Sequence, residues 1–177
     1  MKRFAALLAG LGLFVFLTGG AFAADDSLSR EANAAFLANN ARQPGVNIRP
    51  SGLQYKIIKS GFGKRPGPRD SVTCYYKGQL INGKVFDATE PGFPANFTVN
   101  QLIPGWTEAL ELMREGDRWQ LVVPANLAYG ERGAGDGNIP PNQTLVFDLE
   151  LLSVTPAPAE KPSDKDQGPG GSGAQDL

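Results

Sequence analysis

A single helical period within a series of strand-like segments is the strongest constraint on how residues 50–155 can fold. The helical face consists of four residues at positions i, i+3, i+4 and i+7: Trp106, Ala109, Leu110 and Met113. Gly116 follows where a helix is expected to end. Many strands and one amphipathic helix predict an α+β domain, in which a twisted antiparallel β-sheet wraps around the helix and buries its apolar stripe.

The strand-like segments are short, rich in β-branched and aromatic residues, and separated by glycine, proline or asparagine. They comprise residues 53–58, 71–80, 84–86, 97–99, 119–123 and 145–154. Asn82-Gly83 lies between two of them and predicts a tight hairpin. In the last segment apolar and polar residues alternate, which is typical of a strand with one face in the core.

The first 23 residues are typical of an export signal. Lys2 and Arg3 precede an uncharged apolar run over residues 4–17, and a small-x-small cleavage site ends at Ala23. The alternative is a membrane anchor, but Gly19-Gly20 interrupts the run before the roughly 20 apolar residues that a spanning helix needs. We therefore expect an exported chain without a membrane anchor after cleavage, located in the periplasm or released as a secreted protein.

Two further segments flank the predicted domain. Residues 24–49 form a short helical segment and linker, with Ser29 as the N-cap and Pro44-Gly45 as the stop. Its helical spacing places four residues on one face: Ala32, Ala35, Phe36 and Asn39. A helix of this length is marginal in water unless it packs on something. Residues 156–177 contain four prolines and four glycines and predict a disordered tail.

Composition excludes several classes of function. The chain has no histidine and one cysteine, Cys74, so Ser–His–Asp and Cys–His catalysis, histidine metal sites and an intramolecular disulfide are all ruled out. We expect neither a metal nor a cofactor. Without residues 1–23 the net charge is −3, and no cluster of basic residues provides a surface for nucleic acid.

Four motifs resemble the FKBP-type, macrolide-binding prolyl isomerases. They are YKGQLINGKVFD at 76–87, LIPGW at 102–106, LAYG at 127–130 and IPPNQTLVF at 139–147. They occur in the family's order and spacing over nearly all of residues 50–154. PSGLQY at 50–55 and GWTEAL at 105–110 are similar to the bacterial envelope branch that includes the macrophage infectivity potentiators. Many members of that branch dimerise through a long N-terminal helix; here residues 25–49 are short, which leaves a monomer and a weak dimer both open.

The resemblance implies a substrate pocket between helix and sheet. Its catalytic residues would be Tyr76, Phe86, Asp87, Trp106, Tyr129 and Phe147, with Leu102, Ile103, Ile139 and Phe97 binding substrate. Trp106 would form the floor, and Asp87 and Tyr129 would lie at the rim. Ala95 stands where many members have an aromatic residue, so we expect that wall to be more open. Proline-containing polypeptides and macrolide inhibitors are the implied partners.

These residue types suit prolyl isomerisation, which makes and breaks no covalent bond. The barrier is amide resonance, and a dry aromatic pocket disfavours the planar, dipolar ground state relative to the twisted transition state. A tyrosine hydroxyl can hold a carbonyl without ionising, so no histidine is needed. The alternative functional hypothesis is a holdase chaperone that captures unfolded chains and isomerises them incidentally. For each aromatic residue alone, a purely structural place in the core is the competing interpretation.

Overall fold

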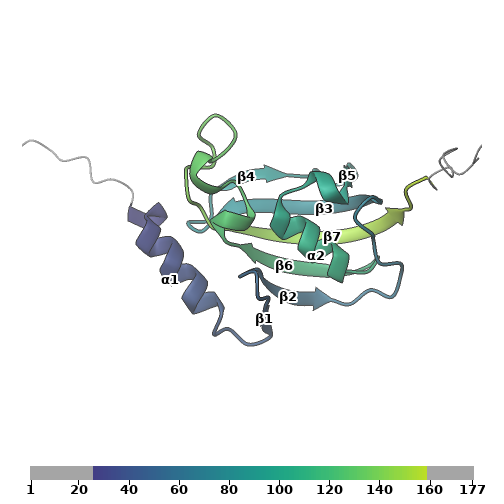
Figure 1. Cartoon of the computed structure of the whole chain (residues 1–177), viewed down its shortest axis with the longest axis horizontal. Coiled ribbons are helices and arrows are strands. Elements are labelled where there is room, and N and C mark those ends of the chain that lie inside the picture. Colours follow the sequence, from purple (N-terminus) through teal and green to yellow (C-terminus); the bar gives the residue numbers. More distant parts are fainter. Residues whose placement is uncertain (1–25, 159–177) are drawn as a thin grey trace, which may run out of the picture.

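The structure is a computed structural model that describes residues 26–158. The predicted export signal and residues 159–177 of the predicted tail lie outside the described residues. Within the described part, one antiparallel sheet faces the helix α2 (Pro104–Leu112), and a second helix, α1 (Arg30–Asn40), lies beside the sheet (Figure 1). The predicted α+β fold is confirmed.

The sheet has seven strands in the order β1-β2-β6-β7-β3-β4, and β5 also pairs with β3. The strands are β1 (Val46–Ile48), β2 (Gln54–Lys59), β3 (Ser71–Leu80), β4 (Val85–Ala88), β5 (Ala95–Thr98), β6 (Arg118–Val123) and β7 (Leu145–Thr155). On one side, β3 pairs with β7 along its whole length. On the other side it pairs first with β5 and then with β4, which leaves Tyr75 and Tyr76 without a strand partner there.

The core lies between the sheet and α2. Leu121, Val123 and Leu149 alternate toward the helix and are fully buried. They pack against Ala109 and Leu110, which lie on the predicted apolar face of α2. Burial of one helix stripe against one sheet face therefore accounts for the main stabilisation of the domain.

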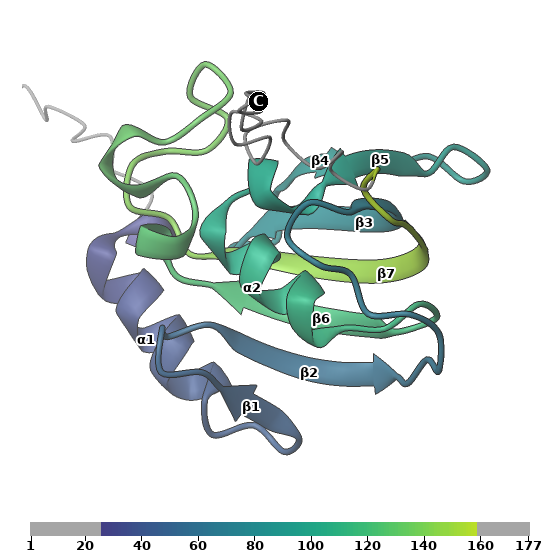
Figure 2. The same ribbon diagram turned by 45° about the vertical axis from the view of Figure 1, so that its right-hand side comes forward.

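The opposite face of the sheet is covered at one end by α1. Gln54, Val122 and Val146 lie directly opposite one another on β2, β6 and β7, pointing away from the α2 side, and all three are buried. The Gln54 side chain donates to the Leu37 carbonyl and accepts from Asn40 on α1. Figure 2 shows α1 against this end of the sheet. The N-terminal helix is therefore a packed part of the domain.

Two details differ from the sequence prediction. Ala35 and Asn39 are exposed, and the face of α1 that packs against the domain contains Asn33 and Asn40 instead. At Asn82-Gly83 only Gly83 has a positive φ, +86°. Because a two-residue type I′ turn needs positive φ at both positions, the chain forms a longer turn, with Gly83 N–H donating to Leu80 O.

Within residues 26–158, no helix is long and apolar enough to cross a membrane.

Candidate functional site: an aromatic cavity between the sheet and helix α2

A cavity of about 120 Å³ opens between α2 and the sheet. The residues that line it are Tyr76, Phe86, Asp87, Phe97, Leu102, Ile103, Trp106, Tyr129 and Phe147. They come from β3, β4, β5, the start of α2, the β6–β7 connection and β7. The sequence therefore anticipated all nine lining residues, although the pocket draws them from six separate parts of the chain.

Trp106 is the centre of this aromatic cluster. Its ring makes edge-to-face contacts with Tyr76 at 5.2 Å, Phe147 at 5.2 Å and Phe97 at 5.8 Å between ring centroids. Phe86 packs on Phe147 in the same way, at 5.7 Å. Edge-to-face pairs fix ring orientation and add to the stabilisation from burial. The walls are thus rigid, apolar and aromatic, and Trp106 itself is only 4% exposed.

The start of α2 explains why Trp106 points at the sheet. Pro104 begins the helix, a position at which its missing N–H costs nothing. At Gly105 a Cβ atom would lie 2.4 Å from the Val123 side chain, so only glycine lets this turn approach β6 so closely. The Thr107 hydroxyl then donates to the Val99 carbonyl at 2.7 Å. The LIPGW motif therefore fixes both the helix position and the tryptophan at the base of the cavity.

The rim carries the polar groups. The Tyr76 hydroxyl donates to Asp87 Oδ2 at 2.5 Å. Burial, followed by this hydrogen bond, raises the pKa of Tyr76 well above its ordinary value. Burial and the nearby Asp87 charge also raise the pKa of Tyr129. Both phenols therefore stay neutral, and Tyr129, which lines the cavity, is 40% exposed.

Cys74 lies on β3, two residues before Tyr76, and is fully buried. Burial raises the pKa of its thiol to about 12, so the thiolate that a nucleophile requires does not form near neutral pH. Within the described residues, no group of three or more acidic or cysteine side chains is arranged to hold a metal ion. The arrangement is suited to binding and orienting an apolar group.

Activity at this site should be nearly independent of pH. Both rim tyrosines and Cys74 have raised pKa values, so these groups remain protonated as pH rises through neutrality. For the Xaa-Pro isomerisation that the motif resemblance implies, we expect the rate per mole of protein to change less than about twofold between roughly pH 6 and 8. The measurement is peptide exchange by NMR at several pH values. A bell-shaped profile in this range would contradict the absence of a titrating catalytic group.

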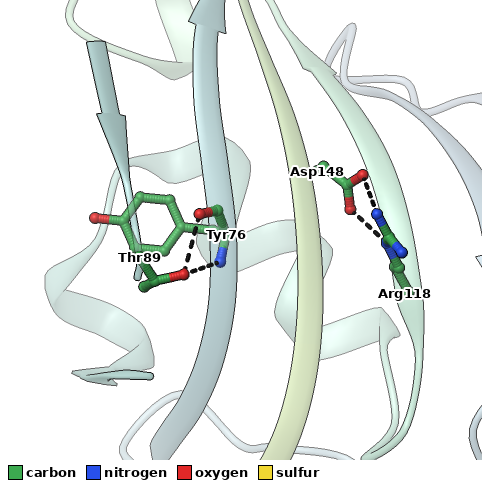
Figure 3. Close-up of polar contacts among 4 residues, drawn as sticks. All are labelled: Tyr76, Thr89, Arg118 and Asp148. Atoms are coloured by element: carbon green, nitrogen blue, oxygen red, sulfur yellow. Dashed lines mark hydrogen bonds and ion pairs between the residues drawn. The ribbon is translucent and has the colours of Figure 1, made fainter. Parts of the chain in front are cut away.

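Thr89 supports Tyr76 and was not predicted from the sequence. Its hydroxyl accepts from Tyr76 N–H at 3.0 Å and donates to Tyr76 O at 3.2 Å, as Figure 3 shows. Its own N–H also donates to Tyr76 O at 3.0 Å. Thr89 thus replaces the missing strand partner of β3 at the point where Tyr76 enters the cavity. No motif marks this residue, because the contact depends on where β4 ends.

Two of the residues singled out in the sequence lie apart from the lining. Ile139 is 6% exposed and belongs to the same hydrophobic core cluster as Trp106 and Phe147, and its predicted role in binding substrate stays a prediction. It also forms a two-way backbone bridge with Ala134, which closes the tip of the β6–β7 connection. Ala95 pairs with Cys74 and does not line the cavity.

A wider hollow of about 530 Å³ lies on the opposite face of the sheet. Figure 3 shows its ion pair, in which Arg118 on β6 binds both carboxylate oxygens of Asp148 on β7 at 2.7 Å. This pairing raises the pKa of Arg118. Arg118 and Asp148 thus form an ion pair with each other, and Glu150, which also lines the hollow, forms an ion pair with Lys59. The smaller aromatic cavity is therefore the better candidate for an apolar ligand.

Fold and cavity together define a small sheet-and-helix domain with an aromatic cavity of a size and lining that fit an apolar ring. The family model of the FKBP-type peptidyl-prolyl cis-trans isomerase matches residues 63–152. The model of the domain amino terminal to FKBP-type peptidyl-prolyl isomerase matches residues 21–57, a range that includes α1. The chain belongs to the family of FKBP-type peptidyl-prolyl cis-trans isomerases.

Individual relatives are similar over most of this chain. The outer membrane protein MIP of Legionella longbeachae is 56% identical over 70% of this chain and 53% of its own length. The probable isomerase FkpA of Neisseria meningitidis serogroup B is 48% identical over 81% of this chain and 54% of its own length. Among solved structures, a peptidyl-prolyl cis-trans isomerase from Pseudomonas syringae pv. tomato is 37% identical in sequence and superposes with a TM-score of 0.66. The match covers 71% of this chain and 92% of the Pseudomonas chain. The chain thus spans about half the length of these two curated relatives.

Proposed function

We propose that this chain accelerates rotation about Xaa-Pro peptide bonds in exported polypeptides, by holding the proline ring in the aromatic cavity. The observation that supports this most strongly is the cavity itself, in which Trp106 is surrounded by aromatic rings from three strands. The absence of histidine from the chain and the raised pKa values of both rim tyrosines favour a reaction without proton transfer.

The proposed mechanism follows from the electronic structure of the amide. Rotation of a peptide bond has a barrier of about 18–20 kcal/mol, because the planar amide is stabilised by resonance. Resonance also makes the planar form more dipolar than the twisted form. A site that excludes water and offers few polar partners therefore stabilises the twisted form relative to the planar one, and this difference lowers the barrier.

Each part of the site has a proposed role in this scheme. Trp106 and Phe147 hold the pyrrolidine ring, so that rotation occurs in the rest of the peptide. Tyr129 donates a hydrogen bond to a substrate carbonyl near the opening. Asp87 accepts from Tyr76 and so fixes the wall that Tyr76 forms. Asp87 thereby shapes the pocket, and it exchanges no proton with the substrate.

A direct assay tests the proposal. The full chain is added to a short peptide with one Xaa-Pro bond, and the cis–trans exchange is followed by NMR exchange spectroscopy. Uncatalysed exchange takes tens to hundreds of seconds, so catalysis appears as new exchange cross-peaks. A folded protein that leaves the exchange rate unchanged would exclude this function. A macrolide ligand of the family is the matched inhibitor, and we expect it to compete with the peptide for the cavity.

Tyr129→Phe should weaken activity modestly. The change removes one hydroxyl at the partly exposed rim and leaves the ring, so one hydrogen bond to the substrate is lost. Such a bond contributes about 0.5–1.5 kcal/mol, which corresponds to a loss of roughly two- to tenfold in kcat/KM. Tyr75→Phe is the control, since its hydroxyl accepts from Gly92 N–H outside the cavity. An equal loss in both variants would argue against a role for the Tyr129 hydroxyl in substrate binding.

We further propose that the protein is exported and acts in the periplasm. Support comes from the signal-like first 23 residues and from similarity to relatives that include one named as an outer membrane protein. The proposed division is a signal at 1–23, a helical segment at 24–49, the isomerase domain at 50–155 and a tail at 156–177. The sheet begins earlier, with β1 at Val46, so the helical segment also contributes a strand. N-terminal sequencing of protein purified from the periplasm tests cleavage after Ala23.

A further inference from the structure

The contact between α1 and the isomerase domain is mediated by side-chain amides. Asn33 is only 5% exposed, and its Oδ1 accepts from Thr144 N–H at 2.7 Å. Its Nδ2 lies 3.2 Å from Gln143 Oε1 and 2.9 Å from Ser29 O. Every side-chain polar group of Asn33 is therefore bonded, and two of these bonds cross from the helix to the chain just before β7. Buried networks of this kind fix one arrangement, because each lost partner leaves an unsatisfied group.

Gln143 completes the contact from the other side. Its Nε2 donates to Leu28 O at 3.1 Å and to Pro141 O at 3.0 Å, and its side chain is also buried. One amide group thus joins the segment before α1 to the return limb of the β6–β7 connection. In Figures 1 and 2 this connection, drawn in green, lies beside the N-terminal end of α1.

The same limb is tied to the rim of the cavity. Asn142, next to Gln143, donates its N–H to Gly130 O at 2.8 Å. Gly130 directly follows Tyr129, the rim residue that lines the opening. A short path of hydrogen bonds therefore runs from Asn33 on α1, through residues 142–144, to the backbone beside Tyr129.

We propose that Asn33 and Gln143 form a latch through which α1 holds the β6–β7 connection, and with it Tyr129, in the position that receives the peptide. Asn33 is thus a positioning residue for substrate binding, outside the cavity. This inference rests on the proposed isomerase function. A connection that is already ordered binds peptide more tightly, because less conformational freedom is lost on binding.

The latch predicts a change in KM more than in kcat. Asn33→Ala frees the connection in the unbound protein, and the peptide must then order it in both the ground and the transition state, so binding weakens uniformly. We expect KM for an Xaa-Pro peptide to rise roughly three- to tenfold, with kcat within about twofold of the parent. Gln143→Ala removes the other half of the latch and should give the same pattern if Asn33→Ala does not fold.

Two control variants lie on the same helix. Asn40→Ala breaks the contact with Gln54 at the far end of α1, and Asn39→Ala changes an exposed residue. Both should leave KM unchanged. Amide hydrogen exchange of the free protein provides a second readout: Asn33→Ala should accelerate exchange at Asn138 and Asn142, whereas Asn40→Ala should not.

The outcomes separate the latch from the proposed function. An unchanged KM in both Asn33→Ala and Gln143→Ala, with an active parent, would overturn the latch and leave the isomerase function standing. An equal rise of KM in Asn40→Ala would also overturn it, because the effect would then reflect general loosening of α1. If the parent chain itself were inactive, the proposed function would fail, and hydrogen exchange at Asn138 and Asn142 would still decide whether Asn33 holds the connection.

Discussion

Trp106→Ala is expected to bring Xaa-Pro isomerisation close to the uncatalysed rate. The change removes the base of the cavity together with the edge-to-face contacts that orient Tyr76, Phe97 and Phe147. Deleting a buried tryptophan also lowers the free energy of unfolding, by about 3–5 kcal/mol. The measurements are peptide exchange by NMR and urea unfolding of the same preparation.

The chain's second tryptophan provides a matched control. Trp119 is also 4% exposed and stacks on Tyr55 at 4.5 Å, away from the cavity lining. The first comparison is between Trp106→Ala and Trp119→Ala. If these variants unfold, the milder pair Trp106→Phe and Trp119→Phe gives the same comparison. We expect both phenylalanine variants to lose similar stability and only Trp106→Phe to lose activity, by about tenfold in kcat/KM. Equal losses of activity in the two variants would indicate that Trp106 acts only through stability.

Gly78→Ala is expected to have the next largest effect. Gly78 lies on β3 opposite Phe147, and a Cβ atom there would approach the Phe86 ring to 2.6 Å and the Phe147 ring to 2.8 Å. Both rings would have to move, and both line the cavity. Overpacking of this kind costs about 1–3 kcal/mol of stability, and we expect kcat/KM to fall by roughly tenfold or more because the proline site is displaced.

Lys77→Ala is the control for this substitution, because Lys77 is the neighbouring residue on β3 and is exposed on the other face. It should retain stability and activity. Circular dichroism and thermal unfolding measure the loss of stability, and peptide exchange measures the loss of kcat/KM, so the two effects can be told apart. Full activity in Gly78→Ala would mean that the positions of Phe86 and Phe147 do not limit the reaction.

The sheet and α2 could be predicted from local patterns. The prediction of a strand over residues 71–80 has the bounds of β3, and the last predicted strand corresponds to β7. One face of each strand lies in the core, so the alternation of apolar and polar residues along the sequence follows which side chains are buried. The helical stripe of α2 is also correct, because Trp106, Ala109 and Leu110 face the sheet.

The N-terminal region was harder to predict because polar contacts hold it. An apolar spacing rule placed Ala35 and Asn39 on the packed face, but the buried residue of α1 is Asn33. Its amide is satisfied by Thr144 and Gln143, which lie more than a hundred positions away along the chain. Strand β1 was missed for a related reason: it has three residues, and its side chains are mostly exposed. A strand of this kind has no alternation of apolar and polar residues from which it could be predicted.

For the site, motif resemblance proved more informative than periodicity. Nine of the ten residues proposed from the sequence line one cavity, and their catalytic and binding roles stay predictions. The tenth, Ile139, is buried and forms a backbone bridge with Ala134, and it does not line this cavity. Thr89 could not be anticipated, since it acts through a hydrogen bond to the backbone of Tyr76.

NMR with a proline peptide tests directly whether the aromatic cavity holds the proline ring. The chain has two tryptophans, so the spectrum contains two indole N–H signals, which Trp119→Phe assigns. On titration with an Xaa-Pro peptide we expect the Trp106 signal to shift and the Trp119 signal to stay in place, and we expect the peptide to cause no shift of the Trp106 signal once a macrolide occupies the cavity. If catalysis were present while the Trp106 signal stayed unmoved and resonances of Arg118 and Lys77 on the opposite face shifted, proline would bind outside the cavity.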